Sequence, residues 1–120
     1  MKLSGVMLNS ENPTRLAEFY TKVLGEPSWQ QGDMYGYGSL ESSIMIMGHS
    51  ELHGDTKEPQ RVLIPFVCDD MDADFTRIVG YGARVIAEPK SPNPSRPELR
   101  LATLSDPDGN YIQLTTPWEM

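Results

Sequence analysis

A repeated helix ending limits how this chain can fold more than any other feature of its sequence. The run "FYTKVLG", which begins at Phe19, resembles "FTRIVG", which begins at Phe75, about 56 residues later and with a gap of one residue. One strand-like run precedes each copy, and three more follow it. The sequence therefore predicts a unit of order βαβββ that occurs twice, as modules 1–57 and 58–120.

Both predicted helices have recognisable boundaries. The dipeptide Asn12-Pro13 is a strong start signal, because an asparagine side chain caps a helix and proline is tolerated in the first turn. Apolar residues then recur with the spacing of one helix face as far as Gly25, a residue suited to end a helix. In the second module, either Asp69 or Asp70 caps a helix that ends near residues 80–82.

The remaining regular segments have the composition and alternation of strands. Two precede the helices and six follow them, three in each module. The predicted strands lie in residues 2–9, 27–32, 34–39, 42–48, 61–68, 83–89, 98–105 and 110–116.

Length and charge restrict the class of protein. A chain of 120 residues can form one ordinary core but not two independent ones, so we expect a single domain over residues 1–120. Seventeen acidic residues against ten basic ones give a net charge of −7, which disfavours nucleic acid and anionic membranes as partners. The N-terminal residues contain no long apolar run, so we expect a cytoplasmic protein.

Three motifs together resemble a known family. The helix ending "FYTKVLG", the helix entry "CDDMDADF" and the turn with its following strand, "DPDGNYIQL", occur in the order and at the spacing of the vicinal oxygen chelate superfamily. This superfamily includes glyoxalase I, extradiol dioxygenases, methylmalonyl-CoA epimerase and bleomycin resistance proteins. The resemblance implies an α+β fold in which two βαβββ modules form an eight-stranded, funnel-like sheet, with one helix per module packed outside. It also implies a homodimer.

The resemblance does not extend to the metal ligands. Enzymes of the superfamily hold one divalent metal ion inside the funnel, with ligands from four strands. The corresponding positions here are Gly5, Met45 or Met47, Leu63 and Gln113. Glycine and leucine cannot coordinate a metal, and a thioether or an amide is a poor ligand for hard or borderline divalent ions. We therefore expect neither a metal, nor a cofactor, nor the catalytic residues of the family.

Alternation along the strands predicts which side chains line the funnel instead. They form a largely apolar set with an amide, a phenol and a guanidinium, which is a composition typical of a binding pocket. Alternatively, these side chains fill a closed core. The candidate ligand-binding residues are Met7, Asn9, Trp29, Tyr37, Met45, Met47, Arg61, Leu63, Tyr111 and Gln113.

Three other segments allow more than one interpretation. The run "HSELH", with His49, Glu51 and His53, is either a zinc site or a solvated loop, and its position between two glycines favours the loop. The proline-rich residues 89–98 form either a surface loop or a lid over a ligand. Trp118 is suited to seal an edge or a subunit contact.

The sequence thus predicts a metal-independent small-molecule-binding protein similar to the bleomycin resistance branch. Its ligand would be apolar or aromatic, and the acidic surface leaves room for a cationic one. The alternative is a divergent lyase, isomerase or dioxygenase with a relocated metal or none, which rests on analogy of fold alone. A third interpretation is a structural domain whose funnel is closed by side chains.

Overall fold

The computed structural model describes residues 1–117 and has an α+β architecture. Its contacts divide the chain into two compact units, unit 1 from Met1 to Gly54 and unit 2 from Asp55 onward. The division falls after Gly54 rather than after residue 57, where the sequence repeat placed it. Trp118 lies outside the described residues. Among the helices that are described, none is long and apolar enough to cross a membrane.

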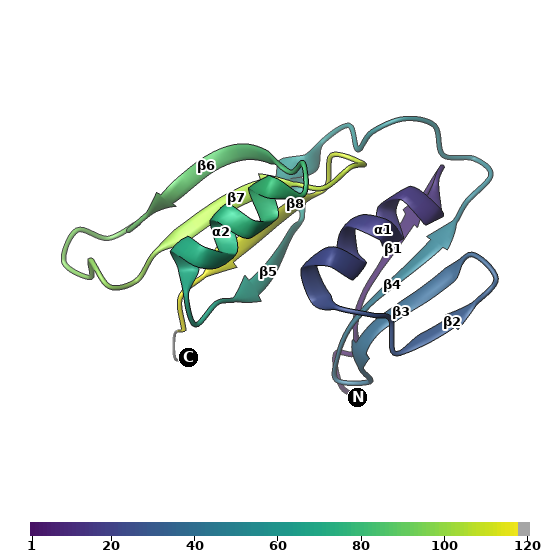
Figure 1. Cartoon of the computed structure of the whole chain (residues 1–120), viewed down its shortest axis with the longest axis horizontal. Coiled ribbons are helices and arrows are strands. Elements are labelled where there is room, and N and C mark those ends of the chain that lie inside the picture. The colour runs from purple at the N-terminus through teal and green to yellow at the C-terminus, as the bar shows by residue number, and fades with distance from the viewer. Residues whose placement is uncertain (118–120) are drawn as a thin grey trace. The chain divides into compact units, whose positions relative to one another are not determined.

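Unit 1 contains one helix and a four-stranded sheet of order β1-β4-β3-β2 (Figure 1). Strands β1 and β4 pair in parallel, and the other pairs are antiparallel. The helix lies between β1 and β2 in the chain and packs on β1, β3 and β4. The elements are β1 (Gly5–Ser10), α1 (Pro13–Leu24), β2 (Trp29–Gln31), β3 (Met34–Ser39) and β4 (Ser42–Gly48).

Unit 2 repeats this topology, with a sheet of order β5-β8-β7-β6 in which β5 and β8 pair in parallel (Figure 1). The prediction of two βαβββ modules is therefore confirmed. A 3₁₀ helix precedes the first strand. The elements are η1 (Pro59–Arg61), β5 (Leu63–Val67), α2 (Met71–Gly80), β6 (Arg84–Lys90), β7 (Leu101–Ser105) and β8 (Tyr111–Thr115).

The helix caps are those that the sequence indicated. The Asn12 side chain accepts a hydrogen bond from the Arg15 amide at 3.1 Å, and Gly25 ends α1 with a φ of 95°. Asp70, not Asp69, caps α2, because its carboxylate accepts from the Ala73 amide at 3.1 Å. Each such cap stabilises its helix by about 1 kcal/mol.

One face of each sheet packs on its helix and forms a core. Side chains at alternate positions of the strands meet the apolar stripe of the helix, as expected for sheets with one covered face. The core of unit 1 includes Leu16, Phe19, Tyr20, Ile44 and Ile46, and that of unit 2 includes Ile64, Ile78, Leu104, Ile112 and Leu114.

The turn between β7 and β8 has the structural role expected from "DPDGN". One carboxylate oxygen of Asp106 accepts from the amides of Asp108 and Asn110, each at 2.9 Å. Gly109 adopts a φ of 80°, which glycine tolerates better than other residues. Thr56 bonds to the same turn, through its amide to the Asp108 carbonyl and through its hydroxyl to Asn110. The turn is therefore a scaffold feature of unit 2.

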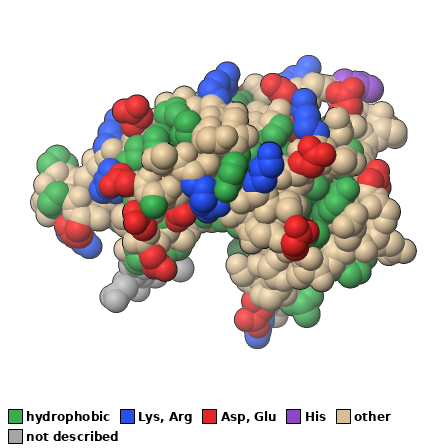
Figure 2. All heavy atoms as spheres, viewed as in Figure 1, with side chains coloured by type: hydrophobic (Ala, Val, Ile, Leu, Met, Phe, Trp, Pro, Cys, Tyr) green, Lys and Arg blue, Asp and Glu red, His purple; other side chains and the backbone are tan. Residues whose placement is uncertain are grey.

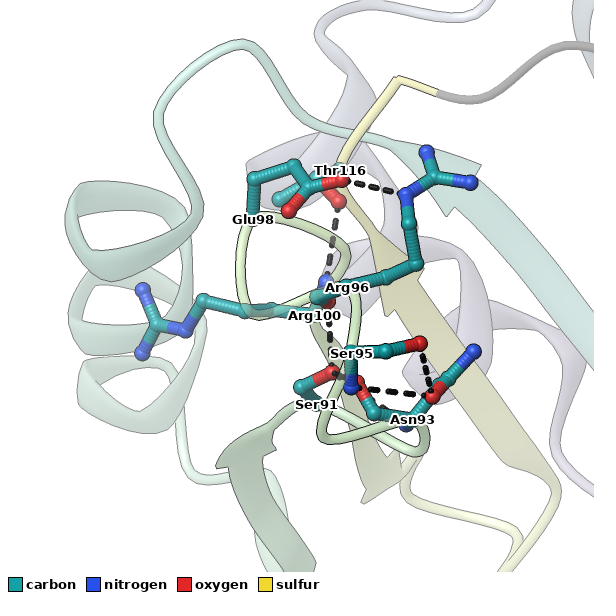
Figure 3. Close-up of polar contacts among 7 residues, drawn as sticks. All are labelled: Ser91, Asn93, Ser95, Arg96, Glu98, Arg100 and Thr116. Carbon is teal, nitrogen blue, oxygen red and sulfur yellow. Dashed lines mark hydrogen bonds and ion pairs between the residues drawn. The ribbon is translucent and has the colours of Figure 1, made fainter.

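The proline-rich loop between β6 and β7 is held by its own polar groups (Figure 3). The Ser91 hydroxyl lies 2.7 Å from the carbonyl oxygens of both Asn93 and Arg96. The Asn93 side-chain oxygen accepts from the amide and the hydroxyl of Ser95. A loop that satisfies its own hydrogen bonds in this way has a preferred shape without a ligand.

Arg100 anchors the end of this loop. Its guanidinium donates to both carboxylate oxygens of Asp72 on α2, at 3.0 and 3.1 Å, and this contact lowers the pKa of Asp72. Its backbone exchanges hydrogen bonds with Thr116, one of which Figure 3 shows to the threonine hydroxyl. These contacts favour the surface-loop interpretation over a mobile lid.

Candidate ligand-binding site

The sheet of unit 1 has one face that α1 does not cover, which we call the open face. Alternation in β1 leaves Met7 and Asn9 exposed, whereas Val6 and Leu8 are half-buried. Directly paired residues of neighbouring strands point to the same side of a sheet, so the register extends this face to the other strands. Its members include Met7, Asn9, Trp29, Gly36, Met45 and Met47.

Four of these positions form one row across the whole sheet. Met7 pairs with Met45, Met45 with Gly36, and Gly36 with Trp29. A Cβ atom at Gly36 would lie 3.0 Å from the Met45 sulfur and 3.6 Å from the Trp29 ring. Gly36 does not have a positive φ, so the backbone itself does not require glycine there. The missing side chain leaves a narrow slot between a thioether and an indole, which takes a further group only if the flexible Met45 side chain shifts.

A pocket of about 510 Å³ opens over this slot, a volume suited to a small molecule. Among the lining residues that lie within 1–117, none carries a carboxylate, ammonium, guanidinium or imidazole group. Two of its serine hydroxyls are engaged by the backbone: Ser28 donates to the Gly36 and Gly38 carbonyls, and Ser43 donates to Ser4. The lining consists of Ser4, Ser28, Trp29, Gly36, Tyr37, Gly38, Ser39, Leu40, Ser43 and Met45.

Five of the six predicted residues of unit 1 divide into three groups. Trp29, which is 44% exposed, and Met45 line the pocket. Met7 flanks Met45 on the neighbouring strand. Asn9 and Met47 pair with each other further along the same face and do not line the pocket.

Tyr37 packs beneath the sheet, in agreement with the alternative that the predicted side chains fill a core. Its side chain is only 3% exposed, and its hydroxyl donates to the Ala17 carbonyl at 2.9 Å and lies 2.8 Å from the Thr21 hydroxyl. Burial raises the pKa of this phenol. Tyr37 follows Gly36 in β3, so its side chain belongs to the face that α1 covers, and it supports the pocket from below.

Three of the four predicted residues of unit 2, Leu63, Tyr111 and Gln113, lie on the corresponding uncovered face of its own sheet. Leu63 pairs with Tyr111, and Gln113 pairs with Pro65 and Thr103. Gln113 is half-buried, and within residues 1–117 its amide makes no hydrogen bond. This face therefore carries a polar group that is available to a ligand.

Arg61 does not belong to this face. The sequence placed it in the first strand of unit 2, but Pro59 begins a 3₁₀ helix that contains it, and β5 begins only at Leu63. Its exposed guanidinium pairs with Glu58 at 3.0 Å. Pro59 favours a turn here, so the strand predicted from the apolar run begins two residues later than expected.

The residues at the superfamily's metal-ligand positions do not fit a divalent ion. Gly5 has a φ of 154°, and a Cβ atom there would lie 2.0 Å from the Ser43 carbonyl oxygen. Neighbouring backbone thus occupies the space from which a ligand side chain would start. Leu63 has no donor atom, and the thioethers of Met45 and Met47 and the amide of Gln113 are poor donors for such ions.

The histidine-rich segment of unit 1 is not organised as a metal site either. His49 Nδ1 accepts a hydrogen bond from the Glu51 amide, whereas His53 Nδ1 lies 3.6 Å from Glu11. The Gly54 amide and His53 lower the pKa of Glu11. Nowhere in the described part of the chain do three His, Cys, Asp or Glu side chains gather in a way that could hold a metal.

Sequence reasoning missed the floor and the polar rim of the pocket. Gly36 and the serines of the lining were not among the predicted residues. The signal was present in "MYGYGS", where glycine alternates with tyrosine and so leaves one face of a strand without side chains.

Comparison with known proteins gives one family and many structures of the same fold. Residues 5–115 match the family model described as a glyoxalase-like domain. A glyoxalase/bleomycin resistance protein from Albidiferax ferrireducens T118 is 22% identical with a TM-score of 0.76, over 96% of this chain and 98% of that one. No curated protein sequence matches the chain.

Two further solved structures have names that refer to particular proteins. TioX from Micromonospora sp. ML1 is 17% identical with a TM-score of 0.72, over 97% of this chain and 98% of its own. The fosfomycin resistance protein FosX from Mesorhizobium loti is 19% identical with a TM-score of 0.70, over 97% and 92%. At these identities the likeness establishes the fold and leaves function to the residues of the site.

Proposed function

Because the chain belongs to the glyoxalase-like family, we propose that it binds a flat, apolar or aromatic small molecule, without a metal ion, on the open face of unit 1. The observation that carries this proposal is the slot at Gly36 between Trp29 and Met45. Solved structures of the same fold include proteins named for resistance to bleomycin or fosfomycin. Those names are consistent with small molecules as ligands of this fold.

The shape and chemistry of the slot favour a planar ligand. An indole offers a large flat face, and stacking against it contributes about 0.5–1.5 kcal/mol beyond the burial of area. The Met45 side chain is flexible and polarizable, so it can adapt to the opposite face of a ring. A bulky, non-planar group would collide with one of these two walls.

The charge of the ligand follows from the lining and from the rest of the surface. The described part of the lining has no charged side chain, so it suits a neutral group. Figure 2 shows acidic and basic side chains mixed over the face in view, and the chain as a whole carries a net charge of −7. Long-range attraction therefore favours a cationic ligand over an anionic one.

A fluorescence titration tests the proposal. Trp118→Phe leaves Trp29 as the sole tryptophan, so its emission reports on the pocket. We expect saturable changes with the neutral dye phenylnaphthylamine and the planar cation thioflavin T. Gly36→Ala should weaken binding, because the added methyl group enters the slot.

Gly80→Ala is the matched control, because a Cβ atom there would meet nothing within 4 Å. Flat titrations with both dyes would refute the binding proposal. Equal affinities of the Gly36→Ala and Gly80→Ala variants would refute the placement of the site. Metal content measured by inductively coupled plasma mass spectrometry tests metal independence separately: one tightly held ion per chain would contradict it.

The described residues contain no cluster of His, Cys, Asp or Glu that could serve as a relocated metal site, which counts against that form of the enzyme alternative. A homodimer is part of the proposal as well. Light scattering coupled to size-exclusion chromatography tests it.

A further inference from the structure

The methionine in the wall of the unit 1 pocket is placed where oxidation would change binding. We propose that Met45 is a peroxide-sensitive modification site, and that its sulfoxide closes the pocket to apolar ligands. This inference rests on the binding function proposed above and adds a form of regulation to the same site.

The methionines of the chain differ widely in access to solvent. Met7, the partner of Met45 across the β1–β4 pair, is 62% exposed, whereas Met71 in the core of unit 2 is 4% exposed. Met45 is half-buried and lines a pocket that is open to solvent. A small oxidant such as hydrogen peroxide can therefore reach the Met45 sulfur through the same opening as a ligand.

The sulfur itself faces the slot. It lies 3.0 Å from the position that a Gly36 Cβ atom would take, and the Trp29 ring lies 3.6 Å from that position. Peroxide transfers one oxygen atom to the thioether: its O–O bond breaks, a sulfur–oxygen bond forms, and water is released. The sulfur is oxidised by two electrons, and a flexible apolar wall becomes a polar one.

Two of the four serine hydroxyls in the described lining are not free to donate to the new polar oxygen. The hydroxyls of Ser28 and Ser43 already donate to backbone carbonyls, at 2.9–3.2 and 3.1 Å respectively. The sulfoxide therefore attracts water to the pocket wall beside Trp29 and Gly36. An apolar ligand could enter only by displacing that water and leaving the sulfoxide without a hydrogen bond.

The test uses the Trp118→Phe protein with phenylnaphthylamine as the probe. Affinity is measured before and after graded treatment with hydrogen peroxide, and peptide mass spectrometry follows the sulfoxide at each methionine. We expect affinity to fall by about tenfold as Met45 is oxidised. Treatment with methionine sulfoxide reductases A and B should restore it.

Two matched variants assign the effect. Met45→Leu replaces the sulfur with a branched apolar group, so peroxide should leave its affinity at the value of the untreated variant. Met7→Leu should still lose affinity, because Met45 remains oxidisable. Circular dichroism confirms that the treated proteins stay folded.

Three results would overturn the inference: unchanged affinity with Met45 fully oxidised, an equal loss in the Met45→Leu variant, or no Met45 sulfoxide before Met71 is modified. Failure of the untreated protein to bind any planar probe would instead refute the binding function, and the inference would fall with it.

Discussion

Gly5 offers the sharpest test of whether β1 can carry a side chain at its first position. Replacement by alanine adds one methyl group at a position whose φ is 154°, outside the region that side chains readily adopt. That methyl group would lie 2.0 Å from the Ser43 carbonyl oxygen and 2.5 Å from the Ser43 hydroxyl, where ordinary contact is 3.4–4 Å. The neighbouring strand must move, or the first residue of β1 must detach.

Both responses are costly. Strain at such a backbone position costs of order 1–3 kcal/mol. Detachment of the strand end gives up the hydrogen bond from the Ser43 amide to the Ser4 carbonyl, worth about 1 kcal/mol, and exposes part of the sheet. We therefore expect Gly5→Ala to lower the free energy of unfolding by about 2 kcal/mol, as measured by urea denaturation followed by circular dichroism.

Gly80→Ala serves again as the control, because its methyl group meets open space at the end of α2. It should leave stability unchanged or raise it slightly, since alanine favours helix more than glycine does. A Gly5→Ala protein as stable as the Gly80→Ala protein would refute the reasoning. In that case β1 could accept a side chain at this position, and Gly5→His would become a route to a metal ligand.

Two further predictions concern buried groups. Tyr37→Phe removes the hydroxyl that contacts Ala17 and Thr21, so it should lower the free energy of unfolding by about 1–2 kcal/mol while dye affinity stays within twofold; a stability equal to that of the parent would contradict the assigned role. Burial, reinforced by the Asp74 carboxylate, raises the pKa of the Cys68 thiol to about 11 from 9.0. Its neutral form therefore favours the folded state below pH 9, and this contribution is lost as pH rises toward 11. Stability should fall over that interval less steeply in Cys68→Ala, and iodoacetamide at pH 8 should modify the native thiol far more slowly than the unfolded one.

Regular local signals made most of the fold predictable from sequence. The Asn12-Pro13 start and the repeated helix ending fixed both helices, because capping and amphipathic spacing act within a few residues. The choice between Asp69 and Asp70 depended on which carboxylate reaches the Ala73 amide, a matter of one residue of register that spacing alone cannot decide.

The candidate site was predictable only where alternation was regular. Met7, Met45 and Trp29 share a face because each strand keeps a period of two, but the face of Tyr37 depended on its pairing with Ile44. The close approach of Ser43 to Gly5 is a tertiary contact between strands far apart in sequence, so no local pattern announces it. The sequence shows that residue 5 is a glycine, but it does not show which atoms lie where a side chain would be.

The parallel pairs β1–β4 and β5–β8 determine when each sheet can be completed as the chain is synthesised. The first strand of each unit, β1 or β5, pairs with a strand that is synthesised only after the helix and two more strands. Its backbone hydrogen-bonding groups are therefore unpaired for much of translation. In unit 2 this first strand is β5, "LIPFV", an apolar segment of the kind that associates with other chains. Pro65 at its centre has no amide hydrogen for pairing with a strand of another chain, so we expect its replacement to promote aggregation during synthesis.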